Sequence, residues 1–80
     1  MVTAVVLIKV EPLKEKRVFV ELQKIKGIKD LHQILGMYDI YMKIVCNTYE
    51  ELSKIVLDDI RNIHGVLDTR TLPEAQFGSL

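Results

Sequence analysis

The spacing of apolar and polar residues changes several times along the chain, and each change marks the end of one element. Thr3–Val10 is dense in valine and isoleucine, which is typical of a buried strand, and Pro12 ends it because proline has no N–H for a sheet ladder. From about Leu13 to Ile25 the apolar residues follow helical spacing instead. The full pattern predicts strands at Thr3–Val10, Ile28–Leu35, Asp39–Cys46 and Val66–Leu72, and helices at about Leu13–Ile25 and between Thr48 and Gly65.

The second helix has the clearest start signal. Thr48-Tyr-Glu-Glu51 is a capping box, in which the Thr48 hydroxyl accepts from the Glu51 N–H and the Glu51 side chain reaches back. Gly65 suits the left-handed stop after this helix, as Gly27 does after the first. The buried face of the second helix is expected to hold Leu52, Ile55, Val56, Ile60 and Ile63.

The two halves of the chain repeat one another. Leu22–Ile28 reads Leu-Gln-Lys-Ile-Lys-Gly-Ile, and 38 positions later Ile60–Val66 reads Ile-Arg-Asn-Ile-His-Gly-Val. The order strand, helix, strand, used twice with right-handed crossovers, predicts a four-stranded antiparallel sheet with both helices on one face. The predicted fold class is therefore α+β, the ferredoxin-like βαββαβ arrangement, in a single domain over residues 1–80. The short tail, 73–80, is expected to be loose or docked on a neighbour.

Alternation along the strands leaves apolar side chains on the sheet face turned away from the helices. When Val6 and Ile8 face the helices, their neighbours Val5 and Leu7 face away. Six such side chains represent about 10 kcal/mol of burial free energy, comparable to the whole stability of a small domain. We therefore expect a second copy to pack sheet to sheet as a two-fold homodimer, a dimeric α+β barrel. The alternative is a face with scattered exposed apolar residues. The expected interface residues are Val5, Leu7, Leu31, Leu35, Tyr41 and Val45.

Charge and composition exclude several classes of protein. Eleven basic and eleven acidic side chains are interleaved along the chain, which argues against a nucleic-acid surface because such a surface needs clustered Lys and Arg. The single cysteine, Cys46, fits a reducing compartment, and no run of 18 apolar residues spans a membrane, so the expected location is the cytoplasm. His32, His64 and Cys46 are too far apart for a local metal motif, and we expect no metal and no cofactor.

The link between the halves, Gly36-Met37-Tyr38-Asp39, is the stretch whose chemistry suggests more than packing. Gly36 permits a positive φ and the close approach of a ligand or another backbone. Asp39 can hold a cation such as an amino group. The alternative is an ordinary turn in which Asp39 bonds to its own backbone.

Several short motifs occur together in a specific order: Gly36-x-Tyr38-Asp39 before an apolar strand, Ile60-x-x-Ile63-x-Gly65-Val66 at the end of a helix, and Thr69-x-Thr71 in the last strand. In this order the chain resembles, over residues 3–72, the effector domain of the Lrp/AsnC family, also called the RAM domain. Full-length members place this domain after a helix-turn-helix domain. Because the first strand follows Met1 at once, the chain resembles a stand-alone version of the effector domain.

The resemblance implies sheet-to-sheet dimers that assemble into rings, often octamers, with amino-acid effectors bound between dimers. It places Gly36, Tyr38 and Asp39 in the effector pocket, with Met37 and Ile40 as neighbours in the same wall. It also assigns Thr71, and with it Thr69 on the same face, to the pocket. Leu35 departs from the family, in which a small hydroxyl residue is frequent at that position.

Two functions follow as expectations. The first is a non-catalytic module that binds an amino acid, forms homo-oligomers and modulates full-length Lrp/AsnC-type regulators through mixed assemblies. The alternative is an enzyme of the dimeric α+β barrel type, such as a small monooxygenase or isomerase. Such an enzyme needs a polar or aromatic group in a cavity between helices and sheet, and His32 is the only candidate.

Overall fold

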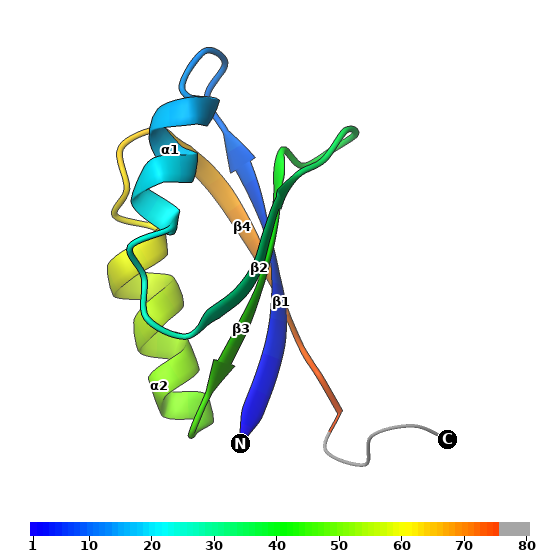
Figure 1. The fold of residues 1–80 in the computed structure, drawn as a ribbon, viewed down its shortest axis with the longest axis vertical. Coiled ribbons are helices and arrows are strands. Elements are labelled where there is room, and N and C mark those ends of the chain that lie inside the picture. The colour runs from blue at the N-terminus through cyan, green and yellow to red at the C-terminus, as the bar shows by residue number, and fades with distance from the viewer. Residues whose placement is uncertain (76–80) are drawn as a thin grey trace.

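The computed structural model describes residues 1–75. Its elements are β1 (Val2–Val10), α1 (Glu15–Leu22), β2 (Ile28–Gln33), β3 (Ile40–Cys46), α2 (Tyr49–Lys54), the π-helix η1 (Ile55–Ile60) and β4 (Val66–Pro73). The four strands form one antiparallel sheet in the order β2-β3-β1-β4. Figure 1 shows the helices packed on one side of this sheet, with the other side uncovered. The predicted ferredoxin-like βαββαβ fold is confirmed.

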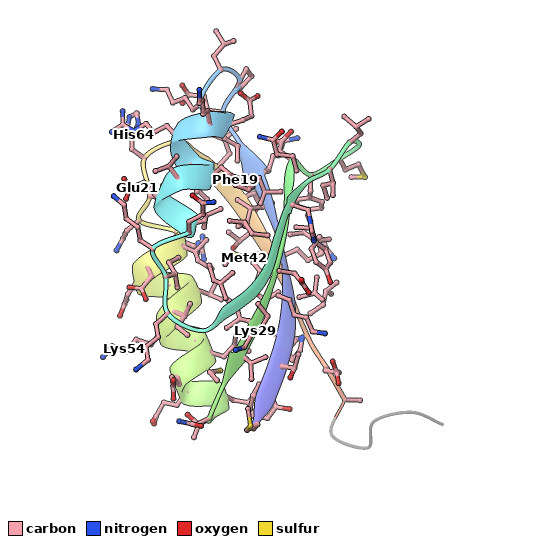
Figure 2. All side chains as sticks on the ribbon, in the orientation of Figure 1. Phe19, Glu21, Lys29, Met42, Lys54 and His64 are labelled. Carbon is pink, nitrogen blue, oxygen red and sulfur yellow. The ribbon has the colours of Figure 1, made fainter. Side chains whose placement is uncertain are left out.

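The core lies between the sheet and the helices. Every second residue of β1 and β3 points into it, and the side chains of Ile8, Ile40, Met42 and Ile44 are fully buried there. Phe19 reaches into the same layer from α1, as Figure 2 shows, whereas the labelled Glu21, Lys54 and His64 lie on the far side of the helices. No polar or charged side chain is buried among residues 1–75, so the layer between helices and sheet is apolar.

The sequence repeat is also a structural repeat. Val18 and Val56 are both buried under the sheet, and so are Leu22 and Ile60. The glycines that follow each helix, Gly27 and Gly65, both have positive φ, at 94° and 108°. The two halves therefore contribute equivalent side chains to one shared core, as the offset in the sequence predicts.

The first helix is shorter than its apolar pattern predicts. Leu13 has a φ of 74°, which no α-helix accommodates, and α1 therefore begins at Glu15. It ends at Leu22, after which the N–H groups of Lys24 and Ile25 bond three residues back, as in tight turns. Gly27 thus has the predicted left-handed conformation, but it ends this turn rather than the helix itself.

The second helix is not uniform. Its predicted start is confirmed, because the Thr48 hydroxyl accepts from the Glu51 N–H at 3.0 Å. After Lys54 the helix widens into η1, where the Arg61 N–H bonds to the Val56 carbonyl five residues back at 3.0 Å. The spacing of buried residues does not distinguish this π-helix from a regular helix.

The sheet face turned away from the helices is named here the outer face. The strand registers place opposite one another residues that share this face, such as Leu7 with Tyr41 and Thr3 with Val45. Its centre is apolar and half-buried, as expected. The outer face consists of Thr3, Val5, Leu7, Lys9, Asp30, His32, Tyr41, Lys43, Val45, Asp68, Arg70 and Leu72.

Two residues expected on the outer face lie elsewhere. Leu31 pairs with Met42 and packs against the core, so its side chain points toward the helices. Leu35 lies beyond β2, which ends at Gln33, and its side chain is 101% exposed in the following loop. The prediction that Leu31 and Leu35 share the outer face is therefore wrong.

At the start of the predicted tail, 73–80, Pro73 still belongs to β4, and the Glu74 N–H donates to the Thr3 carbonyl at 2.7 Å. Residues 76–80 lie outside the described part, so a tail that is loose or docked on a neighbour stays a prediction. None of the helices in residues 1–75 has the length and apolarity needed to cross a bilayer. The same residues bring together no group of three or more His, Cys, Asp or Glu side chains suited to a metal ion.

Candidate functional site

The loop that joins β2 to β3 projects beyond the end of the sheet (Figure 1). It is closed at its base by a bond from the Ile34 N–H to the Asp39 carbonyl at 2.9 Å. Gly36 has a φ of 122°, and nothing lies within 4 Å of the position a Cβ atom would take. The glycine therefore serves the turn itself, and the space beside it is open.

Asp39 fastens this loop to the centre of the sheet. β1 extends past the start of β3, because Ile40 pairs with Ile8 and Val10 lies two residues further on. The Val10 N–H consequently has no backbone partner on β3, and the Asp39 carboxylate accepts its hydrogen bond at 2.7 Å. The Asp39 N–H in turn donates to the Ile8 carbonyl at 2.9 Å. The Asp39 side chain therefore bonds a strand residue 29 positions away rather than the backbone of its own turn.

Tyr38 turns onto the outer face. Its hydroxyl accepts a hydrogen bond from the Arg70 Nε at 3.2 Å. Arg70 belongs to β4 and Tyr38 precedes β3, so the contact reaches across β1. This hydrogen bond, with a smaller electrostatic contribution from the same tyrosine, raises the pKa of the Arg70 guanidinium, which stays charged in any case. Lys9 adds a contact from its Nζ to the Met37 carbonyl at 3.3 Å.

A cavity of about 620 Å³ lies beside the loop on the side of α1. Asp39 lines it together with two charged residues from the first turn of α1, Glu15 and Lys16. The wall is completed by Gln33, Ile34 and Leu35. Volumes of about 300–1,000 Å³ are usual for small-molecule pockets. We name this hollow the loop cavity.

The loop cavity contains residues that the sequence did not single out. Glu15 and Lys16 follow one another on an exposed stretch of an amphipathic helix, where charges are ordinarily solvated. Gln33 is a polar residue near the end of a strand, which is equally ordinary. Arg70, the partner of Tyr38, also had no local signal. Their roles depend on which elements meet in space.

Of the seven residues expected at the site, only Asp39 lines the loop cavity. Gly36, Met37 and Tyr38 belong to the loop but do not line this cavity, and the other three lie elsewhere. Ile40 is fully buried in the core, so its side chain does not form an accessible wall beside Met37, contrary to expectation. Thr69 and Thr71 share one face, as predicted, but the register with Ile8 and Val6 places them across β1 from the loop. Thr71 lines a separate hollow of about 280 Å³ between α2 and β4.

Cys46 lies at the opposite end of β3, at a hollow of about 370 Å³ lined by Lys26, Gly27 and Ile55 among others. The residue is 6% exposed. Burial, with a smaller contribution from the charge of Glu51, raises the pKa of its thiol above the ordinary value. A neutral, buried thiol is a poor nucleophile, which agrees with the expected role of Cys46 in the core.

An α+β fold with a fastened hairpin loop above a charged cavity is the arrangement of a small ligand-binding domain. The chain belongs to the Lrp/AsnC ligand binding domain family, whose sequence model matches residues 3–73.

An uncharacterized HTH-type transcriptional regulator of Pyrococcus furiosus is 38% identical over 73 residues, which are 88% of this chain and 49% of that protein. The chain thus spans about half the length of the curated relatives it matches. The crystal structure of FFRP-DM1 is similar at a TM-score of 0.89 and 27% identity, over 94% of this chain and 100% of that one. A transcriptional regulator of Neisseria meningitidis, solved in complex with L-Met, shares the fold at a TM-score of 0.82 and 18% identity, over 94% and 50% of the two chains.

Proposed function

We propose that this domain is a non-catalytic module that binds an amino-acid effector at the loop Gly36–Asp39 and passes the binding signal to transcription regulation. The observation that carries the proposal is the way the loop is held. Asp39 bonds to Val10 and Ile8, and Tyr38 bonds to Arg70, so the exposed turn is positioned by two strands of the sheet. A positioned polar loop beside a cavity is what binding a small polar ligand requires.

We further propose that the outer face is the surface of a homodimer and that dimers assemble into a higher oligomer, an octamer being the form the family resemblance implies. Val5, Leu7, Tyr41 and Val45 form an apolar centre on this face, and charged side chains surround it. An apolar centre within a polar rim is the usual anatomy of a protein interface. Leu35 and Met37, which are exposed at the tip of the loop, would meet a second dimer.

Binding at the loop would be coupled to assembly. A ligand that binds between subunits stabilises the assembled form over the separate one, because it shifts the population by its differential affinity. Full-length regulators that share this domain would be modulated through mixed assemblies. The domain would then act in the cytoplasm, where the regulators named among its relatives would bind DNA.

The test is a thermal-shift screen of the wild-type protein against the twenty amino acids, beginning with L-methionine, together with light scattering after gel filtration. A stabilising amino acid raises the melting temperature by mass action. We expect the Tyr38→Phe variant to lose part of that increase, and the matched Tyr49→Phe variant on α2 to keep it. A monomer whose melting temperature no amino acid changes would contradict the proposal.

The alternative function, an enzyme of the dimeric α+β barrel type, has no specific observation in its favour. Such an enzyme needs a polar or aromatic group between helices and sheet, but the buried side chains there are apolar throughout residues 1–75. The one candidate, His32, pairs with Tyr41 on the outer face, with the ring centres 6.0 Å apart. The non-catalytic proposal accounts for the loop without such a group.

A further inference from the structure

The hollow between the second helix and β4 corresponds to the loop cavity in the internal repeat. Three of the residues that line it lie 38 positions after residues that line the loop cavity. The pairs are Glu15 with Ser53, Gln33 with Thr71 and Leu35 with Pro73. Each half of the chain therefore forms a hollow between its helix and the end of the strand that follows. We name the second one the β4 hollow; its lining residues are Tyr49, Leu52, Ser53, Val56, Leu57, Thr71 and Pro73.

The two hollows differ in their chemistry. The loop cavity is lined by three charged side chains, whereas none of the residues that line the β4 hollow is charged. Leu52 and Val56 are buried, and Tyr49 and Leu57 are 44% and 53% exposed. Apolar surface that is left open to water is stabilised when another apolar group covers it. The β4 hollow therefore fits an apolar side chain rather than a charged ligand.

The chain leaves the sheet beside this hollow. Pro73 is the last residue of β4 and lines the β4 hollow itself. It pairs with Ala4, which is buried beneath the helices, so Pro73 lies on the helix side of the sheet. The Glu74 N–H donates to the Thr3 carbonyl at 2.7 Å, so the pairing with β1 continues one residue past β4. In Figure 1 the end of β4 lies at the same end of the sheet as the start of α2.

The sequence that follows contains one aromatic residue, Phe77. Side chains alternate along an extended chain, so position 77 falls on the same side as Thr71 and Pro73. Four residues span at most about 14 Å, which limits the distance of Phe77 from Pro73. Phe77 follows Thr71 by six residues, as Asp39 follows Gln33, and that length of chain is enough for Asp39 to line the loop cavity. The β4 hollow is thus within reach of the phenyl ring.

We propose that the β4 hollow is the docking site of the chain's own segment 76–80, with the phenyl ring of Phe77 packed against Val56 and Leu57. A phenylalanine side chain has about 150–250 Å² of surface to bury, and the half-exposed Tyr49 and Leu57 would be covered in return. This inference concerns a hollow other than the candidate effector site, and it does not depend on the proposed function.

The first experiment measures the melting temperature of variants of the full chain. We expect Phe77→Ala to lower it by about 5 °C, and the neighbouring control Gln76→Ala to leave it unchanged. Phe77→Leu keeps an apolar side chain and should recover most of the loss. Equal melting temperatures for Phe77→Ala and Gln76→Ala would overturn the proposal.

A double-mutant cycle then tests where Phe77 docks. In the Leu57→Ala background the decrease caused by Phe77→Ala should become much smaller, because residues in contact are not additive. Val20→Ala is the matched control, since Val20 is a half-exposed apolar residue of α1 that does not line the β4 hollow. In that background Phe77→Ala should have its full effect. The same decrease in both backgrounds would contradict docking against Leu57.

Nuclear Overhauser contacts on the wild-type chain identify which copy provides the segment. We expect contacts between the ring protons of Phe77 and the methyl groups of Val56 and Leu57. A second sample mixes chains labelled only at methyl groups with chains labelled only at aromatic rings, and it should lose these contacts. If the contacts persist in the mixed sample, the segment docks on a neighbouring copy and the proposal is wrong. Absence of the contacts from both samples would also contradict it.

Discussion

The carboxylate of Asp39 and the backbone N–H of Val10 are joined by a hydrogen bond of 2.7 Å between residues 29 positions apart. The bond closes the end of β1 where β3 no longer covers it. It also fixes the loop that carries Gly36 and Tyr38. One side chain thus satisfies the sheet and positions the candidate site, so changes at Asp39 are expected to affect both.

Replacement of Asp39 by alanine tests its structural role. The substitution leaves the half-buried Val10 N–H without an acceptor, which costs about 1–3 kcal/mol of unfolding free energy. The Asp39→Asn variant keeps an oxygen at the same position, so it should lose clearly less stability. Urea denaturation of the two variants measures the difference. Equal losses would mean that the hydrogen bond to Val10 is not what Asp39 contributes.

Gly27 and Gly36 both have positive φ, but only at Gly27 would an added Cβ atom also clash with a neighbour. At Gly27, φ is 94° and an added Cβ would lie 2.9 Å from the Val45 carbonyl oxygen, whereas at Gly36 φ is 122° and the same atom would meet nothing within 4 Å. Positive φ alone costs an alanine about 1–2 kcal/mol. We therefore expect Gly27→Ala to lower the melting temperature more than Gly36→Ala. The reverse order would contradict the close approach of Gly27 to β3.

The outer face can be tested by placing a charge at its centre. Leu7→Lys puts an ammonium opposite Tyr41 and beside Arg70, where a second copy would have to desolvate it. We expect light scattering to show a monomer for this variant and an oligomer for wild type. Leu57→Lys, on the helix side and 53% exposed already, is the control that should keep the wild-type mass. If both variants were monomers, the assignment of the homodimer interface to the outer face would be contradicted.

The raised pKa of the Cys46 thiol predicts that the folded chain loses stability at alkaline pH. Burial, and to a lesser extent Glu51, raises the pKa of its thiol in the folded chain, so the unfolded chain loses this proton first as the pH increases. Stability from the neutral thiol is complete below the ordinary pKa and decreases as the pH rises through the folded-state pKa. The unfolding free energy of wild type should therefore decrease more steeply above the ordinary thiol pKa than that of Cys46→Ala. Parallel profiles would contradict this.

The sequence predicted the fold because its repeat and its alternation are regular, and Leu31 shows where that regularity ends. Ile28 and Leu31 both face the helices, although they are three positions apart. The register of β2 shifts between Ile28 and Asp30, so one residue is extra and the alternation restarts. Strict alternation of side chains along the sequence does not reveal such a bulge. The sequence-based prediction therefore placed Leu31 on the outer face.

The site was predictable only where its residues are close together in the sequence. Gly36, Tyr38 and Asp39 are consecutive or nearly so, and their chemistry is visible as a motif. Glu15 and Lys16 line the loop cavity together with Asp39 only because α1 begins beside the loop, a contact between segments that no local pattern reports. Ile40 was placed at the site because it follows Asp39, although strand alternation turns its side chain into the core.

The position of β1 in the middle of the sheet has a consequence for synthesis. Among the strands of this sheet β1 is made first, and it pairs on one side with β3 and on the other with β4, the last strand in the described chain. Its apolar residues therefore remain without their final neighbours until Val66–Pro73 has been made. Contacts between such distant segments slow folding. A nascent chain halted before β4 would expose an unpaired edge of β1 and uncovered apolar side chains to chaperones.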